Sequence, residues 1–404
     1  MLISAEKEFA MYSNFTYHTP TKVVFGKGTD KETGALVKEF GGTKVLIHYG
    51  GKSAVRSGLI DRVKKSLDEQ EIGYVGLGGV VPNPHLGKIY EGIELGNREN
   101  VDFILAVGGG SVIDSAKAIA LGMANPDTDV WDYYIAGKTT DKALPVGAVL
   151  TIAAAGSEMS TGTVVTDEKT GLKRDFGGTF LCPRFAVMDP ELTMTLPDYQ
   201  TACGVTDILM HTMERFFNLS DNMELVDRFS IELMKNTKKY GLILKEHPED
   251  YKARAEIMWA GSISHNGFTG CGTGGGDWAT HMMEHEMGGM FDVAHGAGLA
   301  AIWGSWARYV HHAAPHRFVK FATEFLGVEP GADDEETIEK GICAMEDFYR
   351  RIGMPTNMRE LGIEPTEEQI RFMAESCSKK TGGTNGAVVP LTVEDMVNIY
   401  RAAL

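Results

Sequence analysis

Carboxylate and imidazole side chains recur at helical spacing in the second half of the chain. Asp207 and His211 are four positions apart, His281 and His285 repeat that spacing, and His295 follows. Residues four apart in a helix lie one turn apart on the same face, so each pair can reach a single ion. A lone Asp-x-x-x-His pair is more often a surface pair. However, His281, His285 and His295 lie within fifteen positions in an apolar, methionine-rich setting, where burying an unpaired imidazole is costly.

Four of these side chains together suit a divalent transition metal: Asp207, His211, His281 and His295. They offer one oxygen and three nitrogens and leave room for a substrate oxygen. Iron, zinc, cobalt, nickel and manganese all accept such a set. His295 follows a helix break that we expect at Gly288 and Gly289.

A second interpretation uses part of the same segment. His281, Glu284 and His285 form the pattern H-x-x-E-H of the inverted zinc peptidases, in which two histidines bind zinc and a glutamate acts as base. Those peptidases do not need a parallel α/β half with a phosphate-type loop. The quartet is therefore the better hypothesis, with the peptidase pattern as its alternative.

A glycine-rich loop in the first half indicates an anion site. The sequence AVGGGSVIDSAKAIA places Gly109, Gly110 and Ser111 where an apolar strand passes into a helix. Glycines let the backbone approach a phosphate, and a helix N-terminus offers free N–H groups. A capping box, with Ser111 as N-cap and Asp114 reaching back, is compatible with the same residues. Weaker candidates are the glycines of 270–276, where close packing is the better interpretation, and His311, His312 and His316.

The elements that must position these groups differ between the two halves. Residues 23–155 alternate β-branched runs, such as KVLIHY at 44–49, with amphipathic stretches, which predicts a parallel sheet covered by helices on both faces. Ligands then gather at the carboxyl ends of the strands. From about residue 190 helical periodicity dominates. We predict an α/β dinucleotide-binding domain over 1–195 and an all-helical metal and substrate domain over 196–404.

Composition excludes several classes of function. The chain has 404 residues and a net charge of -16, which repels nucleic acids and anionic membranes. Its five cysteines stand far apart, no apolar run is long enough for a membrane span, and the first ten residues do not resemble a secretory signal. We therefore expect a cytoplasmic protein without membrane or nucleic-acid partners.

Several motifs resemble the iron-containing, or group III, alcohol dehydrogenase family, and within it the butanol dehydrogenase-like branch. They are NFTYHTPTKVVFGKG, VVPNP, GGGSVIDSAK, SEMSTGTVVTD, DPELTMTLP, TDILMHTMERFF and HMMEHEMGGMFDVAHGAGLA, and they cover nearly the whole chain. The resemblance implies a dehydroquinate synthase-like arrangement of the two domains, with the active site between them. It also implies the same metal quartet and, as a further active-site residue, His285.

The resemblance implies cofactor contacts as well. Gly109, Gly110 and Ser111 would contact the pyrophosphate, and Asp114 would lie near the nicotinamide as a second catalytic candidate. Further contacts match Thr151, Ser157 and Lys173. The family usually has hydroxyl or proline side chains where this chain has Ala153 and Ala154.

The expected activity is hydride transfer between a nicotinamide cofactor and small aliphatic alcohols or aldehydes of the butanol type, with the metal polarising the substrate oxygen. Fe²⁺ is the expected metal, with Zn²⁺ as the alternative. The strand at 44–49 is followed by Gly50, Gly51, Lys52 and Ser53 and not by an acid, which favours NADP(H) over NAD(H). We expect a homodimer. The alternatives are a glycerol dehydrogenase-like or dehydroquinate synthase-like enzyme and a non-catalytic metal- or nucleotide-binding protein.

Overall fold

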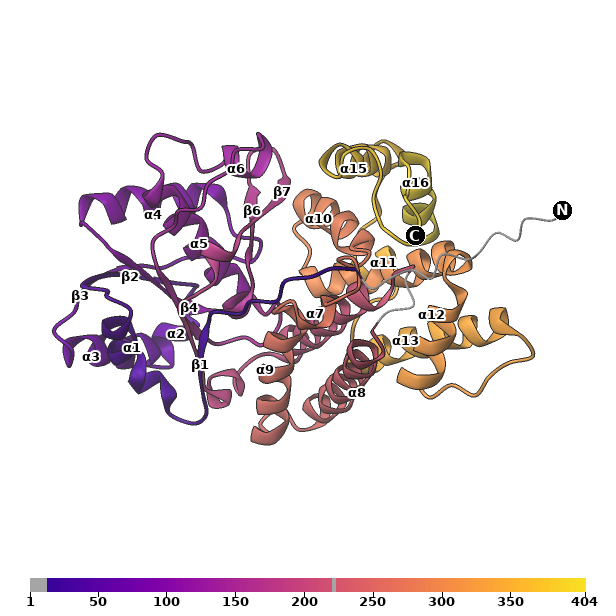
Figure 1. Cartoon of the computed structure of the whole chain (residues 1–404), viewed down its shortest axis with the longest axis horizontal. Helices are drawn as coiled ribbons and strands as arrows, with labels where there is room; N and C mark the ends of the chain where they lie inside the picture. Colours follow the sequence, from indigo (N-terminus) through magenta and orange to yellow (C-terminus); the bar gives the residue numbers. More distant parts are fainter. Residues whose placement is uncertain (1–12, 220–222) are drawn as a thin grey trace.

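A computed structural model describes residues 13–219 and 223–404, so the first ten residues, which were considered for a secretory signal, lie outside the described residues. The first half forms a six-stranded parallel sheet (Figure 1). Its strands, in spatial order, are β1 (Lys22–Phe25), β8 (Phe185–Met188), β5 (Val146–Leu150), β4 (Phe103–Gly108), β2 (Lys44–Tyr49) and β3 (Gly73–Leu77). The predicted parallel sheet is confirmed.

Alternation along β2 shows why helices cover both faces of the sheet. Val45 and Ile47 pack in one apolar cluster with α1 (Thr33–Glu39) and α3 (Leu59–Asp68). Leu46 points to the opposite face, which α4 (Leu86–Arg98) and α5 (Gly110–Ala124) cover. Each large apolar side chain buried in this way contributes roughly 1.5–3 kcal/mol. The loops after the strands therefore lie on a rigid base.

An antiparallel hairpin extends from the α/β half and contacts the helical half. It consists of β6 (Gly162–Asp167) and β7 (Leu172–Gly177). Its ion pairs to the helical half are Lys173–Glu284 at 3.1 Å, Arg174–Glu286 at 2.9 Å and Asp175–Lys380 at 2.5 Å. We call these three ion pairs the hairpin clamp.

The second half is helical (Figure 1), as the sequence predicts. Its longer helices are α7 (Asp198–Phe216), α8 (Glu224–Glu246), α9 (Tyr251–His265), α10 (Ala279–Phe291), α11 (His295–Val310), α13 (Asp334–Ile352), α15 (Glu367–Lys380) and α16 (Val393–Ala402). Shorter ones are α12 (Pro315–Lys320) and α14 (Met358–Leu361) and, in the first half, α2 (Ser53–Arg56) and α6 (Asp132–Ile135). The α/β and helical domains predicted over 1–195 and 196–404 remain a proposal.

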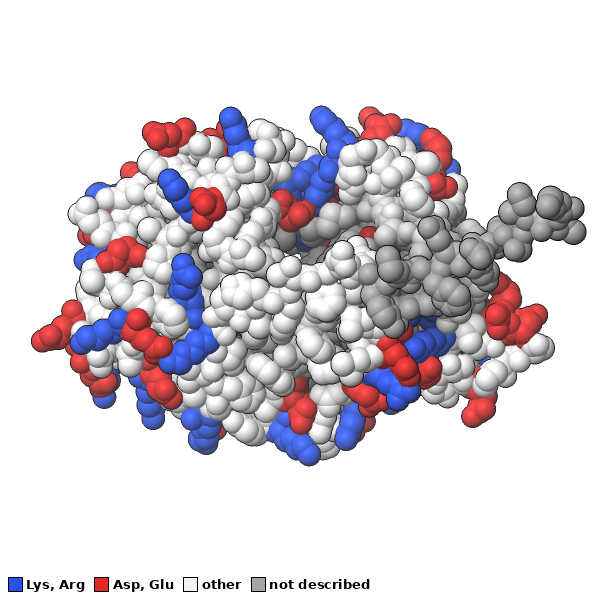
Figure 2. All heavy atoms as spheres, in the orientation of Figure 1, with Lys and Arg blue, Asp and Glu red and all other residues white. Residues whose placement is uncertain are grey.

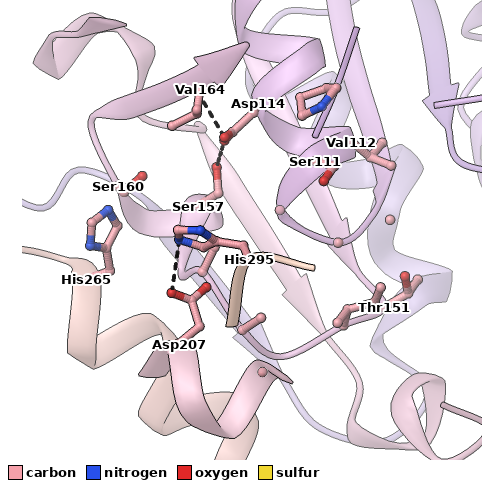
Figure 3. A pocket seen from close by; sticks show the side chains of 18 of the residues that line it. Ser111, Val112, Asp114, Thr151, Ser157, Ser160, Val164, Asp207, His265 and His295 are labelled. Carbon is pink, nitrogen blue, oxygen red and sulfur yellow. Dashed lines mark hydrogen bonds and ion pairs between the residues drawn. The ribbon is translucent and has the colours of Figure 1, made fainter. Parts of the chain in front are cut away.

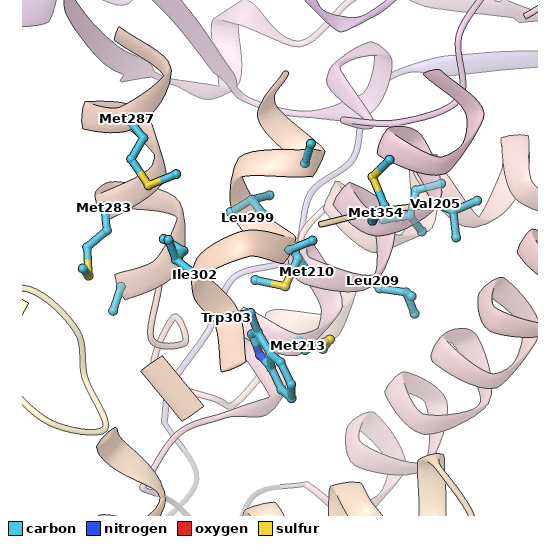
Figure 4. Close-up of a cluster of buried hydrophobic side chains, with 14 of the residues drawn as sticks. Val205, Leu209, Met210, Met213, Met283, Met287, Leu299, Ile302, Trp303 and Met354 are labelled. Carbon is cyan, nitrogen blue, oxygen red and sulfur yellow. The ribbon is translucent and has the colours of Figure 1, made fainter. Parts of the chain in front are cut away.

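Helix α7 lies in the middle of the helical half and is buried along most of its length. Met210 and Met213 of α7, Met283 and Met287 of α10 and Trp303 of α11 belong to one buried cluster (Figure 4). Unbranched methionine side chains fill the irregular gaps between crossing helices. This core fixes α7, α10 and α11 relative to one another, and these helices carry the predicted metal ligands.

Charged side chains of both signs are interspersed on the face shown in Figure 2. Within the described residues, none of the helices combines the length and apolar character that crossing a bilayer requires.

Candidate active site

A cavity of about 2030 Å³ lies between the carboxyl ends of the strands and the helical half. Its wall includes the loops after β2, β3, β4 and β5, the β6–β7 hairpin, and parts of α7, α10 and α11. The strand order changes direction between β2 and β4, and doubly wound sheets bind their ligands outside such a switch point. A ligand in this cavity would contact both halves of the chain.

The glycine-rich loop after β4 lies at the cavity wall, because Gly109, Gly110 and Ser111 all line it. A Cβ atom at Gly109 would lie 2.9 Å from Cβ of Ile152, and one at Gly110 would lie 3.0 Å from Cβ of Ala155. Glycine is therefore required where this loop packs against the loop after β5. The free N–H groups at the start of α5 can bind an anion there.

The capping box predicted for Ser111 and Asp114 is wrong. Helix α5 begins at Gly110 with Gly109 as its N-cap, and no side chain caps it. Asp114 instead accepts hydrogen bonds from Ser157 Oγ at 2.5 Å and from the Val164 amide at 3.0 Å (Figure 3). Burial raises the pKa of Asp114, against the lowering effect of Lys117. The carboxylate ties the β5–β6 loop to α5, and its catalytic role stays a prediction.

Lys117 is a site residue that the sequence analysis missed. It is fully buried, and its ammonium donates at 2.7–3.3 Å to backbone and hydroxyl oxygens of Ser157 and Ser160 and to the carbonyl of Gly162. Burial lowers its pKa, and Asp114 opposes that effect. Lys117 thereby fixes the loop that carries the predicted cofactor contact Ser157. A lysine in the middle of an apolar helix was the available signal.

The predicted metal ligands converge on one carboxylate oxygen, and Figure 3 shows two of them, Asp207 and His295, facing each other. Oδ1 of Asp207 lies 3.6 Å from Nε2 of His211, 3.8 Å from Nε2 of His281 and 3.7 Å from Nε2 of His295. Oδ1 of Asp207 and Nε2 of His281 are buried and have no hydrogen-bond partner among the described residues. Leaving such atoms unpaired is costly, so the donor set fits a divalent cation in size, charge and ligand type.

Two buried glutamates orient the histidines of this cluster. Nδ1 of His281 donates to Glu214 at 2.8 Å, and Nδ1 of His295 donates to Glu284. These bonds fix the tautomers and leave each Nε2 free to coordinate, an arrangement typical of metal-ligating histidines. Burial opposes ionisation of Glu284, but the charges of His295 and Lys173 outweigh it and lower its pKa to about 2. Glu214 lies one turn beyond His211 on α7, so helical spacing could have revealed it.

The helix break expected at Gly288 and Gly289 is wrong, because α10 continues to Phe291. The turn comes at Asp292, which has a φ of 51°, and α11 begins at His295. A Cβ atom at Gly289 would lie 2.1 Å from the carbonyl oxygen of Gly171, so this glycine permits close approach of the β6–β7 turn.

His285 lies one turn beyond His281 and lines the same cavity. Its Nδ1 accepts a hydrogen bond from Lys380 at 3.1 Å, so the neutral ring carries its hydrogen on Nε2. Burial, reinforced by the charge of Lys380, holds the pKa of His285 well below its ordinary value. Because Glu284 is bound to His295 and Lys173, the geometry favours the quartet over the H-x-x-E-H alternative.

Most of the predicted cofactor contacts line the cavity, and they are Gly50, Gly51, Ser53, Gly109, Gly110, Ser111, Asp114, Thr151, Ser157 and Lys173. Lys52 does not line the cavity, and its contact with the cofactor stays a prediction. It precedes the short helix α2 and is exposed. The backbone of the β2–α2 turn faces the ligand space, so the long side chain at this position can extend into solvent.

The opposite end of the cavity is lined by Arg215, His265 and Trp278. The sequence analysis gave no site role to Arg215 or His265. His211 stacks on His265, with 3.9 Å between the ring centroids. Phe268, an aromatic residue nearby in the sequence, does not line the cavity and packs against Tyr17 and Phe229.

The weaker sequence candidates lie outside this cavity. Gly276 approaches the backbone of α7 so closely that a Cβ atom would lie 2.5 Å from the Glu214 carbonyl oxygen, which agrees with a packing role for the loop 270–276. None of His311, His312 and His316 lines the cavity.

Comparison with known proteins relates both halves of the chain to one family. The family described as "Iron-containing alcohol dehydrogenase" matches residues 20–190, and "Fe-containing alcohol dehydrogenase family, C-terminal" matches residues 201–404.

Individual relatives match over nearly their whole lengths. NADH-dependent butanol dehydrogenase A of Clostridium acetobutylicum is 36% identical and covers 96% of this chain and 99% of its own. The NADPH-dependent aldehyde reductase YqhD of Escherichia coli is 34% identical over 87% of this chain and 90% of its own. The crystal structure of NADH-dependent butanol dehydrogenase A from Thermotoga maritima has a TM-score of 0.93, with 38% identity over 97% of this chain and 99% of that one.

Proposed function

The chain belongs to the iron-containing alcohol dehydrogenase family, and on that premise we propose that it is an NAD(P)-dependent alcohol dehydrogenase or aldehyde reductase acting on small aliphatic substrates. The observation that carries the proposal is the cluster around Asp207 Oδ1, with three imidazole nitrogens at 3.6–3.8 Å, in the cavity that the glycine-rich loop also lines. The wall formed by the loop after β4 fits a nucleotide, and the wall formed by α7, α10 and α11 fits a metal ion.

The metal would be held by Asp207, His211, His281 and His295. When bound, it polarises the substrate oxygen, and the nicotinamide exchanges a hydride with the substrate carbon. Glu214 and Glu284 hold two of the imidazoles in the coordinating tautomer. Fe²⁺ is the metal we propose, from the family, and Zn²⁺ is the alternative for this ligand set.

The remaining side chains bind and orient. The N-terminus of α5 holds the pyrophosphate through its free N–H groups, while Lys117 and Asp114 fix the adjoining loop. His285 offers Nε2–H as a hydrogen-bond donor within the cavity. Enclosure between the two halves excludes water and holds the reacting groups at contact distance.

The activity can be tested by following NADPH and NADH absorbance at 340 nm with butanal. We expect oxidation of the cofactor, loss of the rate on chelation, and recovery with Fe²⁺ or Zn²⁺. A protein that turns over glycerol with NAD⁺ but not butanal would favour the glycerol dehydrogenase-like alternative. Absence of turnover with either cofactor in the metal-loaded protein would contradict the proposal.

We propose NADP(H) as the preferred cofactor. Relatives include both NADH- and NADPH-dependent members, so support comes from the loop after β2, which lacks an acid. Ser53, Arg56 and Ser57 line this end of the cavity. The nearby carboxylate of Asp30 is neutralised by Arg62 at 2.5 Å. A 2′-phosphate would find hydroxyls and a cation there.

Gly51→Asp should reverse or strongly lower this preference. No atom lies within 4 Å of a Cβ built at Gly51, so a carboxylate fits there without displacing a neighbour. Its repulsion of a 2′-phosphate is worth about 1–3 kcal/mol, or roughly ten- to a hundredfold in the ratio of kcat/KM for NADPH to that for NADH. Gly51→Asn, equal in size and uncharged, is the matched control. An unchanged ratio in the aspartate variant would disprove the assignment.

The homodimer is also a proposal. Strand β1 forms one edge of the sheet, and Phe25 on it is 40% exposed and packs edge-to-face on Trp259. An open edge with an apolar side chain favours pairing with a second copy. Light scattering during size-exclusion chromatography measures the mass directly.

A further inference from the structure

Arg215 is a buried cation that forms no ion pair with an acid in the described parts of the chain, 13–219 and 223–404. Its side chain lies on α7 one turn beyond His211, lines the cavity and is 8% exposed. Among the described residues, no carboxylate oxygen lies within 4.0 Å of its guanidinium nitrogens. The neighbouring Glu214 is engaged by His281 and Thr280 instead. A guanidinium stays charged in proteins, and a buried charge without a counterion is costly.

The hydrogen bonds of Arg215 leave donors available. Nη1 donates to the carbonyl oxygens of His211 at 2.8 Å and Ser264 at 3.1 Å, and Nη2 lies 3.3 Å from Nδ1 of His265. Five N–H groups are present in a guanidinium, so Nε–H and one hydrogen of Nη2 remain unassigned. Because Nδ1 of His265 accepts from Arg215, the His265 ring presents Nε2–H as a further donor.

Trp278 holds this group of donors in place. The guanidinium lies 4.6 Å from the centroid of its indole ring, and Nε1 of the indole donates to the Gly275 carbonyl at 2.7 Å. Trp278 has a φ of 63°, a backbone conformation that is costly for a bulky residue and that persists where the surroundings enforce it. Trp278 itself also lines the cavity.

The donors of Arg215 and His265 lie next to the metal ligand His211. His265 contacts both groups, because its Nδ1 lies 3.3 Å from Nη2 of Arg215 and its ring stacks on His211 with 3.9 Å between the centroids. Figure 3 shows His265 near Asp207. A small molecule whose oxygen is held at the Asp207 cluster would therefore extend its other end toward Arg215 and His265. That end would meet a cation and an N–H donor, which together suit a carboxylate.

We propose that the substrate of this chain carries a carboxylate at the end opposite its reacting oxygen, bound by Arg215 and His265. The substrates are then short ω-oxo acids and the corresponding hydroxy acids. This inference rests on the proposed alcohol dehydrogenase or aldehyde reductase activity and names the substrate class of that site. The bound carboxylate supplies the counterion that Arg215 lacks among the residues that the structure describes.

The test compares 4-oxobutanoate with butanal, which have the same chain length and differ in the terminal carboxylate. We expect kcat/KM of the wild type to be at least about tenfold higher for 4-oxobutanoate, mainly through KM, because a charge-assisted ion pair forms. Arg215→Gln should bring the ratio of the two kcat/KM values close to one, and Arg215→Lys should restore part of it. Arg228→Gln, at an exposed arginine of α8, is the matched control and should keep the wild-type ratio.

A measurement on the wild type alone guards against variants that fail to fold. Succinate and butanoate both offer one carboxylate to the metal cluster, but only succinate has a second one for Arg215. Succinate should inhibit butanal turnover at least about tenfold more tightly. Turnover of butanal with no preference for 4-oxobutanoate, and equal inhibition by the two acids, would overturn this inference while leaving the proposed activity intact. Absence of turnover with both aldehydes would instead contradict the activity.

Discussion

Replacing His281 by alanine is expected to remove the bound metal and to lower kcat by about a thousandfold or more. His281 supplies one of three imidazole nitrogens around Asp207 Oδ1, and its removal takes away that ligand and the ring that Glu214 orients. The metal stabilises charge on the substrate oxygen by several kcal/mol, which corresponds to a rate factor of this size. Elemental analysis of the purified variant and its rate with NADPH and butanal are the two measurements.

Two further variants make this result specific. His312→Ala changes an exposed histidine outside the cavity and should retain both metal and rate. Glu214→Gln keeps every ligand but weakens the hydrogen bond that orients His281, and we expect metal affinity to fall by about ten- to a hundredfold. Binding of NADPH to the His281→Ala protein, followed by fluorescence, checks that the α/β half is folded. Full activity in a metal-free His281→Ala preparation would disprove the quartet.

Replacing His285 by alanine should lower kcat by about a hundredfold or more while the metal content stays at its wild-type value. The imidazole lines the cavity but does not lie with the three rings around Asp207, and its Nε2–H is the donor that the substitution removes. Metal content and kcat, measured on the same preparation, separate loss of a donor from loss of a ligand. The pH profile of kcat should change as well, because an unligated imidazole acts on protons.

Lys380→Met gives the matched comparison for His285. It leaves the imidazole in place but removes the donor that fixes its tautomer, so we expect a smaller loss of kcat and no loss of metal. If the His285→Ala protein loses its metal, then His285 is a ligand, and the H-x-x-E-H arrangement with Glu284 replaces the quartet.

The sequence predicted the features that depend on local spacing. The apolar run KVLIHY forms β2, and the parallel sheet and the helical second half follow from period alone. Asp207 and His211 lie one turn apart on α7, so their convergence was predictable from the helix. Residue type and spacing also suggested grouping them with His281 and His295, which lie on two other helices, and the family resemblance implied the same quartet.

Features that depend on tertiary packing were not predictable from spacing. Gly288 and Gly289 look like a helix break, but α10 continues to Phe291. Glycine is needed at position 289 because the β6–β7 turn packs closely against the helix there. Asp114 looks like a cap, but its carboxylate is drawn to Ser157 and Val164 across the fold. Lys117 and Arg215 stand within motifs that indicated the family, but no spacing rule gave either residue a role. Their roles depend on backbone carbonyls supplied by distant segments.

The hairpin clamp bears on how this chain could be combined with its relatives. Lys173 and Arg174 precede residue 195, but both are buried against acids of α10, which are Glu284 and Glu286. A chimaera cut at 195 would bring two cations from one parent against whatever the other parent places on that helix. Losing either acid leaves a buried charge unpaired, at about 3–5 kcal/mol each. The best crossover point for recombination therefore lies before β6, so that the hairpin is inherited with the helices it contacts.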